Sequence, residues 1–212
     1  MSKEKVEVED KDNTFKFFLI IVIIMAVLSI GCCVGVLIGY NMNKDDMQVA
    51  SIIINPNTGG VMALSGGIDY SKSQFNRAIS SKRQVGSSMK PFLYYAALEN
   101  GMVSSSTFLS EPTTFMFSNN QSYSPANYNN KYGNKNITMA AALAYSDNIY
   151  AVKTHLFLGE ETLVNTAKRM GIQGELEAVP SLALGTSELS MLDFARGYTT
   201  LASGGYKRNT WR

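Results

Sequence analysis

The sequence predicts a domain of the α/β class that follows one membrane-spanning helix. A long uncharged stretch lies near the N-terminus, two short strand-like runs flank a turn soon after it, and helical patterns fill most of the remaining chain. One hairpin followed mainly by helices is typical of the α/β class. No internal repeat is apparent in the sequence.

The predicted membrane helix runs from Phe17 to Tyr40, 24 residues without a charge. About 20 apolar residues cross a bilayer as a helix, whereas the apolar part of a cleavable signal peptide has only about 7–15. The length therefore favours an anchor. Residues 1–16 carry four lysines and residues 41–56 carry one. Because lysines near a membrane helix stay on the cytoplasmic side, we expect a single-pass protein with a cytoplasmic N-terminus and an extracytoplasmic body.

The chain is predicted to have four parts: a cytoplasmic tail (1–16), the transmembrane helix (17–40), a linker (41–48) and the body (49–212). The body opens with a strand at Val49–Ile54, which we expect to be buried because the run is almost wholly apolar. An Asn-Pro-Asn-Thr-Gly-Gly turn leads to a second strand at Val61–Leu64, and the two strands predict a hairpin.

Helical patterns dominate the rest of the body. Apolar residues recur at helical spacing over Ser87–Glu99, and Pro91 falls within the first turn, where proline is tolerated. The asparagine-rich stretch from Glu111 to Asn136 is predicted to be a long, ordered surface loop. Further helices are predicted at Thr138–Tyr145, Asn148–Phe157, Glu160–Met170 and from Ser190 through Ala202.

The composition argues against several classes of function. Net charge is only +2 and no lysine or arginine block occurs, so the sequence offers no electrostatic reason to expect nucleic-acid binding. Cys32 and Cys33 are adjacent within the apolar stretch and cannot cross-link the body. The single histidine, His155, is expected to be an ordinary helix residue. Without a cluster of cysteine and histidine at ligand spacing, we expect no metal site.

A first candidate motif is Gly86-Ser87-Ser88-Met89-Lys90 at the start of a predicted helix. Residues three apart on a helix project from one face, so Ser87 and Lys90 can meet. A serine hydroxyl needs a nearby base, which a lysine can supply. Backbone N–H groups at a helix N-terminus also favour the oxyanion of acyl transfer. Taken alone, the Ser-x-x-Lys pattern also fits an ordinary capped helix with a surface lysine.

The second candidate motif is Ser146-Asp147-Asn148, at a break between two predicted helices. A hydroxyl and a carboxamide can face a cleft there, the first to pass a proton and the second to hold a peptide bond. Alone, this triplet would usually be a helix cap. Ser-x-x-Lys followed by Ser-Asp-Asn, and then by Lys-Thr-Gly, is the motif order of class A β-lactamases and penicillin-binding proteins.

The resemblance extends well beyond these motifs. Residues 52–101, which contain the first motif, resemble the opening of the transpeptidase domain of class A (bifunctional) penicillin-binding proteins. Around the second motif, AAALAYSDNIYAVK is similar to that family's helix pair, and LALGTSELSMLDFARGYTTLASGGY is similar to the helix that follows. Together these stretches span roughly residues 49–206.

This resemblance implies the penicillin-binding transpeptidase or serine β-lactamase-like fold, a sheet flanked by helices. It also implies the roles of the site residues: Ser87 as the acylated nucleophile, Lys90 as its base, Ser146 as a proton shuttle and Asn148 as a binder of the peptide stem. The implied substrates are peptidoglycan stem peptides ending in D-Ala-D-Ala, and β-lactams are the implied covalent inhibitors.

The sequence departs from the family pattern in two respects. No Lys-Thr-Gly or Lys-Ser-Gly follows Asn148, so the third motif and the C-terminal strands around it are expected to be missing. No stretch between the membrane helix and the body is long enough for a glycosyltransferase domain. The resemblance is therefore to a truncated class A protein.

Three alternatives to an active transpeptidase stay open at this stage. The chain could be a membrane-anchored, non-catalytic remnant or gene fragment, which the missing third motif favours and the intact serine, lysine and asparagine argue against. A D,D-carboxypeptidase or a β-lactamase is the nearest enzymatic alternative. Residues 174–180 lack the Glu-x-x-x-Asn pattern of a class A β-lactamase, which disfavours the last.

Overall fold

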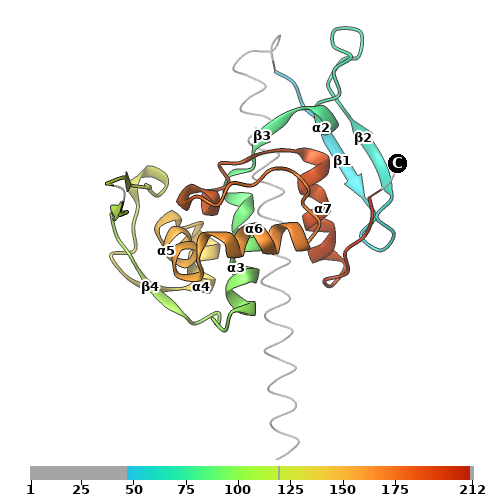
Figure 1. Cartoon of the computed structure of the whole chain (residues 1–212). Helices are drawn as coiled ribbons and strands as arrows, with labels where there is room; N and C mark the ends of the chain where they lie inside the picture. The colour runs from blue at the N-terminus through green and yellow to red at the C-terminus, as the bar shows by residue number, and fades with distance from the viewer. Residues whose placement is uncertain (1–46, 119, 211–212) are drawn as a thin grey trace, which may run out of the picture. The chain divides into compact units, whose positions relative to one another are not determined.

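The computed structural model describes residues 47–118 and 120–210 (Figure 1). The chain divides into two compact units, Met1–Gln48 and Val49–Arg212, and every element below belongs to the second. The predicted cytoplasmic tail (1–16) and transmembrane helix (17–40) lie outside the described residues, so both stay predictions. Within the described ranges, no helix is both long enough and apolar enough to cross a bilayer.

The described chain contains short strands and α-helices of four to twelve residues. The strands are β1 (Ser51–Ile54), β2 (Val61–Ser65), β3 (Lys82–Gln84), β4 (Thr107–Ser110), β5 (Phe115–Met116), β6 (Ser122–Tyr123), β7 (Lys135–Thr138) and β8 (Glu188–Ser190). The α-helices are α2 (Arg77–Ser80), α3 (Lys90–Glu99), α4 (Met139–Tyr145), α5 (Asn148–Leu158), α6 (Glu160–Arg169) and α7 (Met191–Ala202). Three 3-10 turns complete the described elements: η1 (Gly86–Met89), η2 (Tyr128–Asn130) and η3 (Pro180–Leu184).

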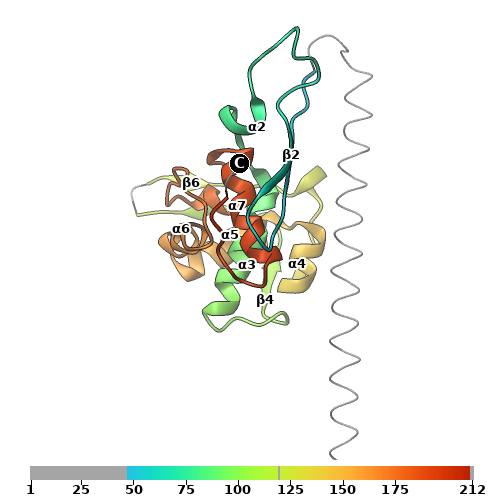
Figure 2. The same ribbon diagram turned by 90° about the vertical axis from the view of Figure 1, so that its right-hand side faces the viewer.

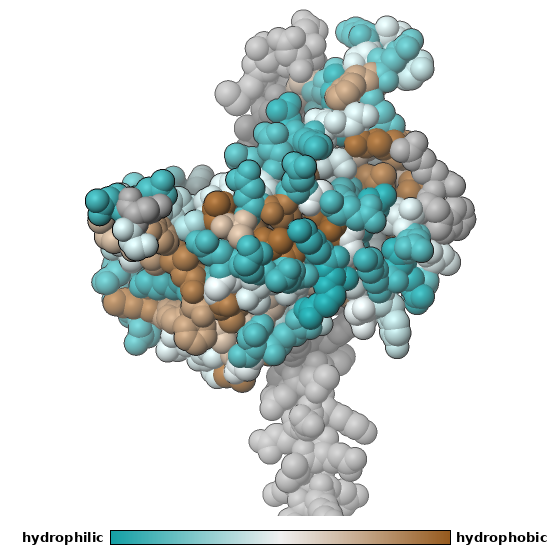
Figure 3. Space-filling model, viewed as in Figure 1, coloured by the Kyte–Doolittle hydropathy of each residue, from teal (hydrophilic) through white to brown (hydrophobic). Residues whose placement is uncertain are grey.

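The predicted hairpin is present as β1 and β2, which pair antiparallel and lie beside α7 in both ribbon views (Figures 1 and 2). The prediction that its first strand is buried is wrong, since the side chain of Ile53 is 56% exposed. Among the described residues β1 and β2 pair only with each other. Alternate side chains, Ile52 and Ile54, face α7, and Ile53 on the other face meets solvent. Figure 3 shows apolar atoms at the surface in this region.

The strands of the described residues pair only in twos: β1 with β2, β3 with β8, β4 with β7 and β5 with β6. The expected sheet flanked by helices is therefore represented here by four short antiparallel ladders around a helical body. The ladder of β3 and β8 joins residues more than a hundred positions apart, with Arg83 opposite Leu189. This ladder holds the segment before the first motif against the segment before α7.

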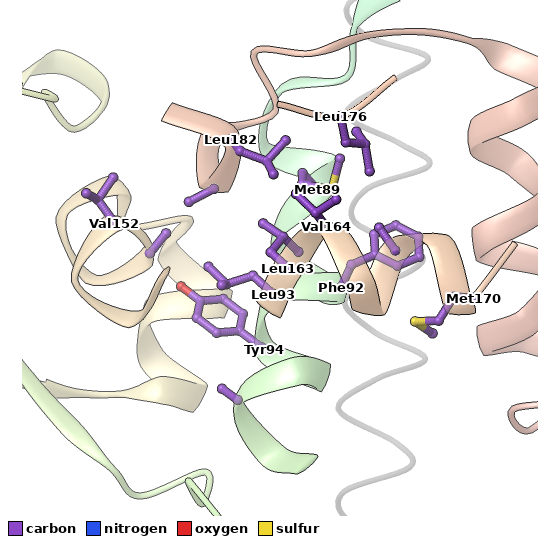
Figure 4. Close-up of a cluster of buried hydrophobic side chains, with 14 of the residues drawn as sticks. Met89, Phe92, Leu93, Tyr94, Val152, Leu163, Val164, Met170, Leu176 and Leu182 are labelled. Atoms are coloured by element: carbon purple, nitrogen blue, oxygen red, sulfur yellow. The ribbon is translucent and has the colours of Figure 1, made fainter. Parts of the chain in front are cut away.

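Helix α3 lies at the centre of the body, and α4, α5 and α6 pack around it (Figure 1). A helix that is apolar on most of its sides is typical of such a central position. Figure 4 shows Phe92 and Leu93 of α3 directed toward Leu163 and Val164 of α6. The fully buried apolar residues of α3 are Phe92, Leu93, Ala96 and Ala97. The first motif thus ends on a helix that is buried in the core of the body.

The helix predicted at Ser87–Glu99 divides into the 3-10 turn η1 and the α-helix α3, and Pro91 explains the division. An α-helical bond would run from the N–H of residue 91 to the carbonyl of Ser87, but proline has no N–H. The carbonyl of Ser87 instead accepts a hydrogen bond from the backbone N–H of Lys90, the shorter pattern of a 3-10 turn. Ser87 therefore lies in a tight turn just before the helix.

The stretch Glu111–Asn136 is more structured than the predicted surface loop. It contains β5, β6 and η2, and its end enters β7, which pairs with β4. Four of its asparagines adopt the left-handed backbone region: Asn120, Asn129, Asn130 and Asn134. Asparagine tolerates this region better than other residues with a side chain. The abundance of asparagine thus reflects a series of tight turns.

The remaining helix predictions are confirmed within one or two residues. Ser190 caps α7, since its hydroxyl accepts a hydrogen bond from the Asp193 backbone N–H at 3.1 Å. The carboxylate of Asp193, however, accepts from the backbone N–H groups of Gln173 at 2.9 Å and Gly174 at 2.6 Å. It therefore fastens the chain after α6 to α7. His155 is a buried residue of α5, and its Nε2 lies 3.1 Å from the carbonyl oxygen of Val179.

Candidate active site

The turn that carries Ser87 is fixed by contacts from two distant segments. The backbone N–H of Gly86 donates to the carbonyl of Gly185 at 3.0 Å. The hydroxyl of Tyr198, on α7, donates to the carbonyl of Ser88 at 2.8 Å. Ser87 itself is exposed. Ser87 is therefore accessible to a reactant in a turn that these two hydrogen bonds position.

The approach of Gly185 to this turn requires two glycines. Gly185 has φ +72°, in the left-handed region, and a Cβ atom added to it would lie 2.1 Å from the carbonyl oxygen of Gly86. Gly86 also has a positive φ, of 59°. No residue with a side chain fits at position 185 unless the serine turn moves.

Lys90 brings the two motifs together. Its side chain is 1% exposed. The Nζ atom donates to the carbonyl oxygen of Ser146 at 2.6 Å, to the Ser146 hydroxyl at 3.0 Å and to Oδ1 of Asn148 at 2.7 Å. These partners lie 56 and 58 residues away in the sequence. The predicted convergence of Lys90, Ser146 and Asn148 on one site is therefore present in the structure.

Burial lowers the pKa of Lys90 from 10.5 to about 8, and the negative charge of Asp147 acts in the opposite direction. Taking an ammonium group out of water disfavours its charged form, which makes the neutral amine accessible near physiological pH. A neutral amine can accept a proton, whereas an ammonium cannot. Lys90 thus has the environment expected of a lysine that acts as a base.

The second motif forms a sharp break between two helices. Helix α4 ends at Tyr145, and Ser146 follows with φ +55° in the left-handed region. Asp147 then caps α5, because its carboxylate accepts a hydrogen bond from the Tyr150 backbone N–H at 2.7 Å. The predicted break is confirmed. The turn leaves Ser146 exposed and directs its carbonyl and hydroxyl toward Lys90.

Asp147, to which the sequence analysis gave no role in catalysis, and Asn127, which it did not single out, support this turn from inside. Asp147 is 5% exposed, and its carboxylate accepts hydrogen bonds from the Ser110 hydroxyl and from Nδ2 of Asn127, the latter at 2.7 Å. An aspartate just before a predicted helix was a usable signal for a cap. No comparable signal marks Asn127, which is one of seven asparagines between residues 119 and 136.

The arrangement also defines what the site does chemically. All three hydrogens of the Lys90 ammonium have acceptors on Ser146 and Asn148. After loss of one proton, the amine has a lone pair for the hydroxyl of a nearby serine. Across the described residues, no group of three or more histidine, cysteine, aspartate or glutamate side chains is placed to hold a metal ion. The Lys90 amine and the Ser146 hydroxyl beside it are groups that can exchange a proton.

Comparison with known proteins shows to which family the chain belongs. A family model described as the penicillin binding protein transpeptidase domain matches residues 49–211. Penicillin-binding protein 2D of Bacillus subtilis is 51% identical over 163 residues, which are 76% of this chain and 24% of that protein. Penicillin-binding protein 1A of Escherichia coli is 34% identical over 168 residues, 78% of this chain and 20% of that protein.

Solved structures give the same result for the fold. The crystal structure of penicillin-binding protein 1A from Haemophilus influenzae matches with a TM-score of 0.72 and 32% identity, over 76% of this chain and 24% of that one. The structure of PonA1 from Mycobacterium tuberculosis matches with a TM-score of 0.64 and 24% identity, over 77% of this chain and 45% of that one. The second match shows the fold alone.

The chain belongs to the penicillin-binding protein transpeptidase family, as the sequence resemblance indicated. Its relatives include penicillin-binding proteins 1A and 2D, and its body has the penicillin-binding transpeptidase fold. The chain spans about a quarter of the length of the curated relatives it matches.

Proposed function

We propose that this protein is a serine D,D-transpeptidase that cross-links peptidoglycan stem peptides through an acyl-enzyme on Ser87. One observation carries the proposal: the buried Lys90 amine contacts the first and last residues of the second motif, Ser146 and Asn148. Family membership and the accessible position of Ser87, one turn before Lys90, support it.

Acylation begins with proton transfer. Neutral Lys90 accepts the hydroxyl proton of Ser87, and the Ser87 oxygen attacks the carbonyl of the penultimate D-alanine. When the bond to the last alanine breaks, the leaving amine takes a proton that passes from Lys90 through the Ser146 hydroxyl. The 3.0 Å contact between Lys90 Nζ and the Ser146 oxygen provides this route. Free D-alanine leaves, and the acyl group stays on Ser87.

Transfer repeats these steps in reverse order. The amine of a neighbouring stem attacks the ester carbonyl and gives its proton, through Ser146, to Lys90. The bond to Ser87 breaks, and the serine oxygen recovers a proton. Asn148 binds the peptide bond of the stem with its carboxamide. A β-lactam carries a comparable carbonyl and acylates the same oxygen, so we propose β-lactams as covalent inhibitors. No cofactor takes part in this scheme.

The proposed setting follows from the sequence. Phe17–Tyr40 anchors the chain in the cell membrane, with the tail at 1–16 in the cytoplasm and the body at 49–212 outside. Peptidoglycan is assembled on that outer side, where the stem peptides are available to Ser87.

A fluorescent penicillin tests the proposal directly. The detergent-solubilised chain is incubated with the reagent, and covalent label is located by mass spectrometry of the peptide that contains Ser87. We expect label on the parent and none on Ser87→Ala. The matched control is Ser88→Ala, which removes the neighbouring exposed hydroxyl and should stay labelled.

Circular dichroism must show that each variant is folded. A folded parent that takes no label contradicts the proposal and favours a non-catalytic member of the family. Label that persists on Ser87→Ala contradicts the assignment of Ser87 as the nucleophile.

A further inference from the structure

Asp147, the middle residue of the second motif, is a buried carboxylate without a direct cationic partner among its described contacts. Its three donors are the Ser110 hydroxyl, Nδ2 of Asn127 at 2.7 Å and the Tyr150 backbone N–H at 2.7 Å. A buried charge is tolerated only when donors of this kind replace its water. Asp147 is therefore a fixed point to which several segments are fastened.

Asn127 connects this fixed point to the asparagine-rich stretch. It is 8% exposed. Its Nδ2 donates both hydrogens, one to Asp147 and one to the carbonyl of Lys131 at 3.0 Å. Its Oδ1 accepts the backbone N–H of Asn148 at 2.7 Å. The carboxamide thus contacts two consecutive residues of the second motif while it holds its own loop closed.

The neighbour of Asn127 orients the Asn148 side chain. Nδ2 of Asn148 donates to the carbonyl of Ala126 at 2.6 Å, and Oδ1 of Asn148 accepts from Lys90 at 2.7 Å. Lysine has only donors and a carbonyl is only an acceptor, so this pair of contacts fixes which end of the carboxamide faces Lys90. Residues 126 and 127 together determine where the Asn148 oxygen lies.

We propose that Asn127 is a positioning residue for the acylation site: it holds Asp147 and Asn148 so that Lys90 stays buried against Ser146 and Asn148. Asn127 does not touch Lys90 or Ser87 in the described contacts and acts through its neighbours. Its consequence for acylation rests on the proposed function, whereas its effect on Lys90 does not.

The first test follows the Lys90 amine by NMR in protein labelled at the lysine side-chain nitrogen, with Lys90→Arg used to assign the signal. Asn127→Ala frees the Asn148 backbone, lets water reach Lys90 and removes a donor from Asp147. The water that reaches Lys90 and the donor lost from Asp147 both favour the ammonium form, so the pKa of Lys90 should rise by roughly one unit from its value of about 8 in the parent. The matched control is Asn136→Ala, an exposed asparagine of β7, which should leave the titration unchanged.

The second test uses the isosteric change Asn127→Asp, in case the alanine variant does not fold. The new carboxyl group keeps an oxygen toward Asn148 but meets the carboxylate of Asp147 at the 2.7 Å contact. At low pH the two groups share a proton and the contact survives, while at higher pH they repel. The acylation rate, as a ratio to the parent, should therefore fall roughly tenfold between pH 5 and pH 8, about 1.4 kcal/mol.

The two readouts separate this proposal from the proposed function. The Lys90 titration needs no reaction at Ser87. It therefore tests the role of Asn127 fully even if the parent does not react with penicillin. A pKa of Lys90 that is unchanged in folded Asn127→Ala overturns the proposal. If the parent is labelled by penicillin, an acylation rate of Asn127→Asp that stays at the same ratio to the parent between pH 5 and pH 8 also overturns it. A rise that appears equally in Asn136→Ala also overturns it.

Discussion

A primary amine accepts a proton from a serine only in its neutral form, and burial brings Lys90 to that form at an unusually low pH. The same burial places the amine against three oxygen atoms of Ser146 and Asn148. Loss of the ammonium proton therefore weakens at least one of these contacts and frees a lone pair at the same moment. If Lys90 acts as the base, as we propose, activation of the serine and loosening of the Lys90 contacts are one event at the scale of single residues.

The pH dependence of acylation follows from this. Burial lowers the pKa of Lys90 to about 8, so the neutral base is scarce below that pH and prevalent above it. The rate of acylation of the parent by penicillin should rise about tenfold per pH unit from pH 6 to pH 7 and level off above about pH 8. Stopped-flow fluorescence with a reporter penicillin measures this. A rate independent of pH between 6 and 9 would contradict the role of Lys90 as base, and Lys90→Arg should lower the rate at every pH.

Asp147→Asn gives a second prediction with two separable effects. Oδ2 of Asp147 accepts from both Ser110 and Asn127, and Oδ1 accepts from the Tyr150 backbone N–H. An amide nitrogen in place of either oxygen therefore meets a donor, so the free energy of unfolding should fall by about 1–3 kcal/mol. The negative charge of Asp147 raises the pKa of Lys90, so its removal should move the rise of the acylation rate to lower pH.

Asp193→Asn is the matched control for this change. Asp193 is also a buried carboxylate, but it accepts from Gln173 and Gly174 and has no described contact with Lys90. Urea titration should show a loss of stability in both variants, and only Asp147→Asn should shift the pH profile. A shift in both would mean that the profile reports general loosening of the body.

The site could be predicted from sequence only where its members have fixed spacing. Ser87 and Lys90 are one turn apart, and Ser146 and Asn148 flank a helix break, so both patterns are readable. Asn127 belongs to the site through its hydrogen bonds to Asp147 and Asn148, which lie about twenty residues away in the sequence. Nothing local distinguishes it from the other asparagines of its loop, because its role depends on tertiary structure alone.

At the scale of elements, the same contrast separates helices from strands. Helix α5 has a side-chain cap in Asp147, and α6 has acidic residues in its first turn and basic residues in its last, so these signals lie within one stretch of chain and the bounds of both helices were predicted closely. β4 and β7 are four residues each, and β7 is largely polar, so only their pairing with each other defines them. Such short strands leave no periodic pattern to read. The 3-10 form of η1 was likewise unforeseen, although Pro91 provides its reason.

A test of the serine turn belongs to this scale. Gly185→Ala places a Cβ atom 2.1 Å from the Gly86 carbonyl oxygen and also strains a backbone with φ +72°. Gly204→Ala has the same strain, with φ +73°, but meets nothing within 4 Å. Both should lose about 1–2 kcal/mol of stability from the backbone. Only Gly185→Ala should displace Ser87 and lower the acylation rate, by roughly 10²-fold, since small displacements of reacting groups have effects of that size. Equal rates in the two variants would show that the contact with Gly185 does not position the serine.

At the scale of the whole molecule, the body at 49–212 combines a central helix with a site on its surface. Helix α3 supplies Lys90 at its first residue and core side chains along the rest, so the position of the base is fixed by the packing of the body (Figure 4). The family match begins at residue 49, where the second compact unit also begins. The fold of this unit and its site are thus properties of the same stretch of chain.

The last prediction concerns the orientation of the chain in a membrane, which the lysine distribution determines. Four lysines lie in residues 1–16 and only Lys44 lies in residues 41–56, so the N-terminal side should remain in the cytoplasm. Protease added to intact spheroplasts should therefore degrade an epitope at the C-terminus and spare one at the N-terminus. In lysed cells both should be degraded, which controls for access. A variant with Lys3, Lys5, Lys11 and Lys16 changed to glutamine should lose this preference. Survival of the C-terminal epitope in intact spheroplasts would place the body in the cytoplasm, away from peptidoglycan, and would count against the proposed function as well as the orientation.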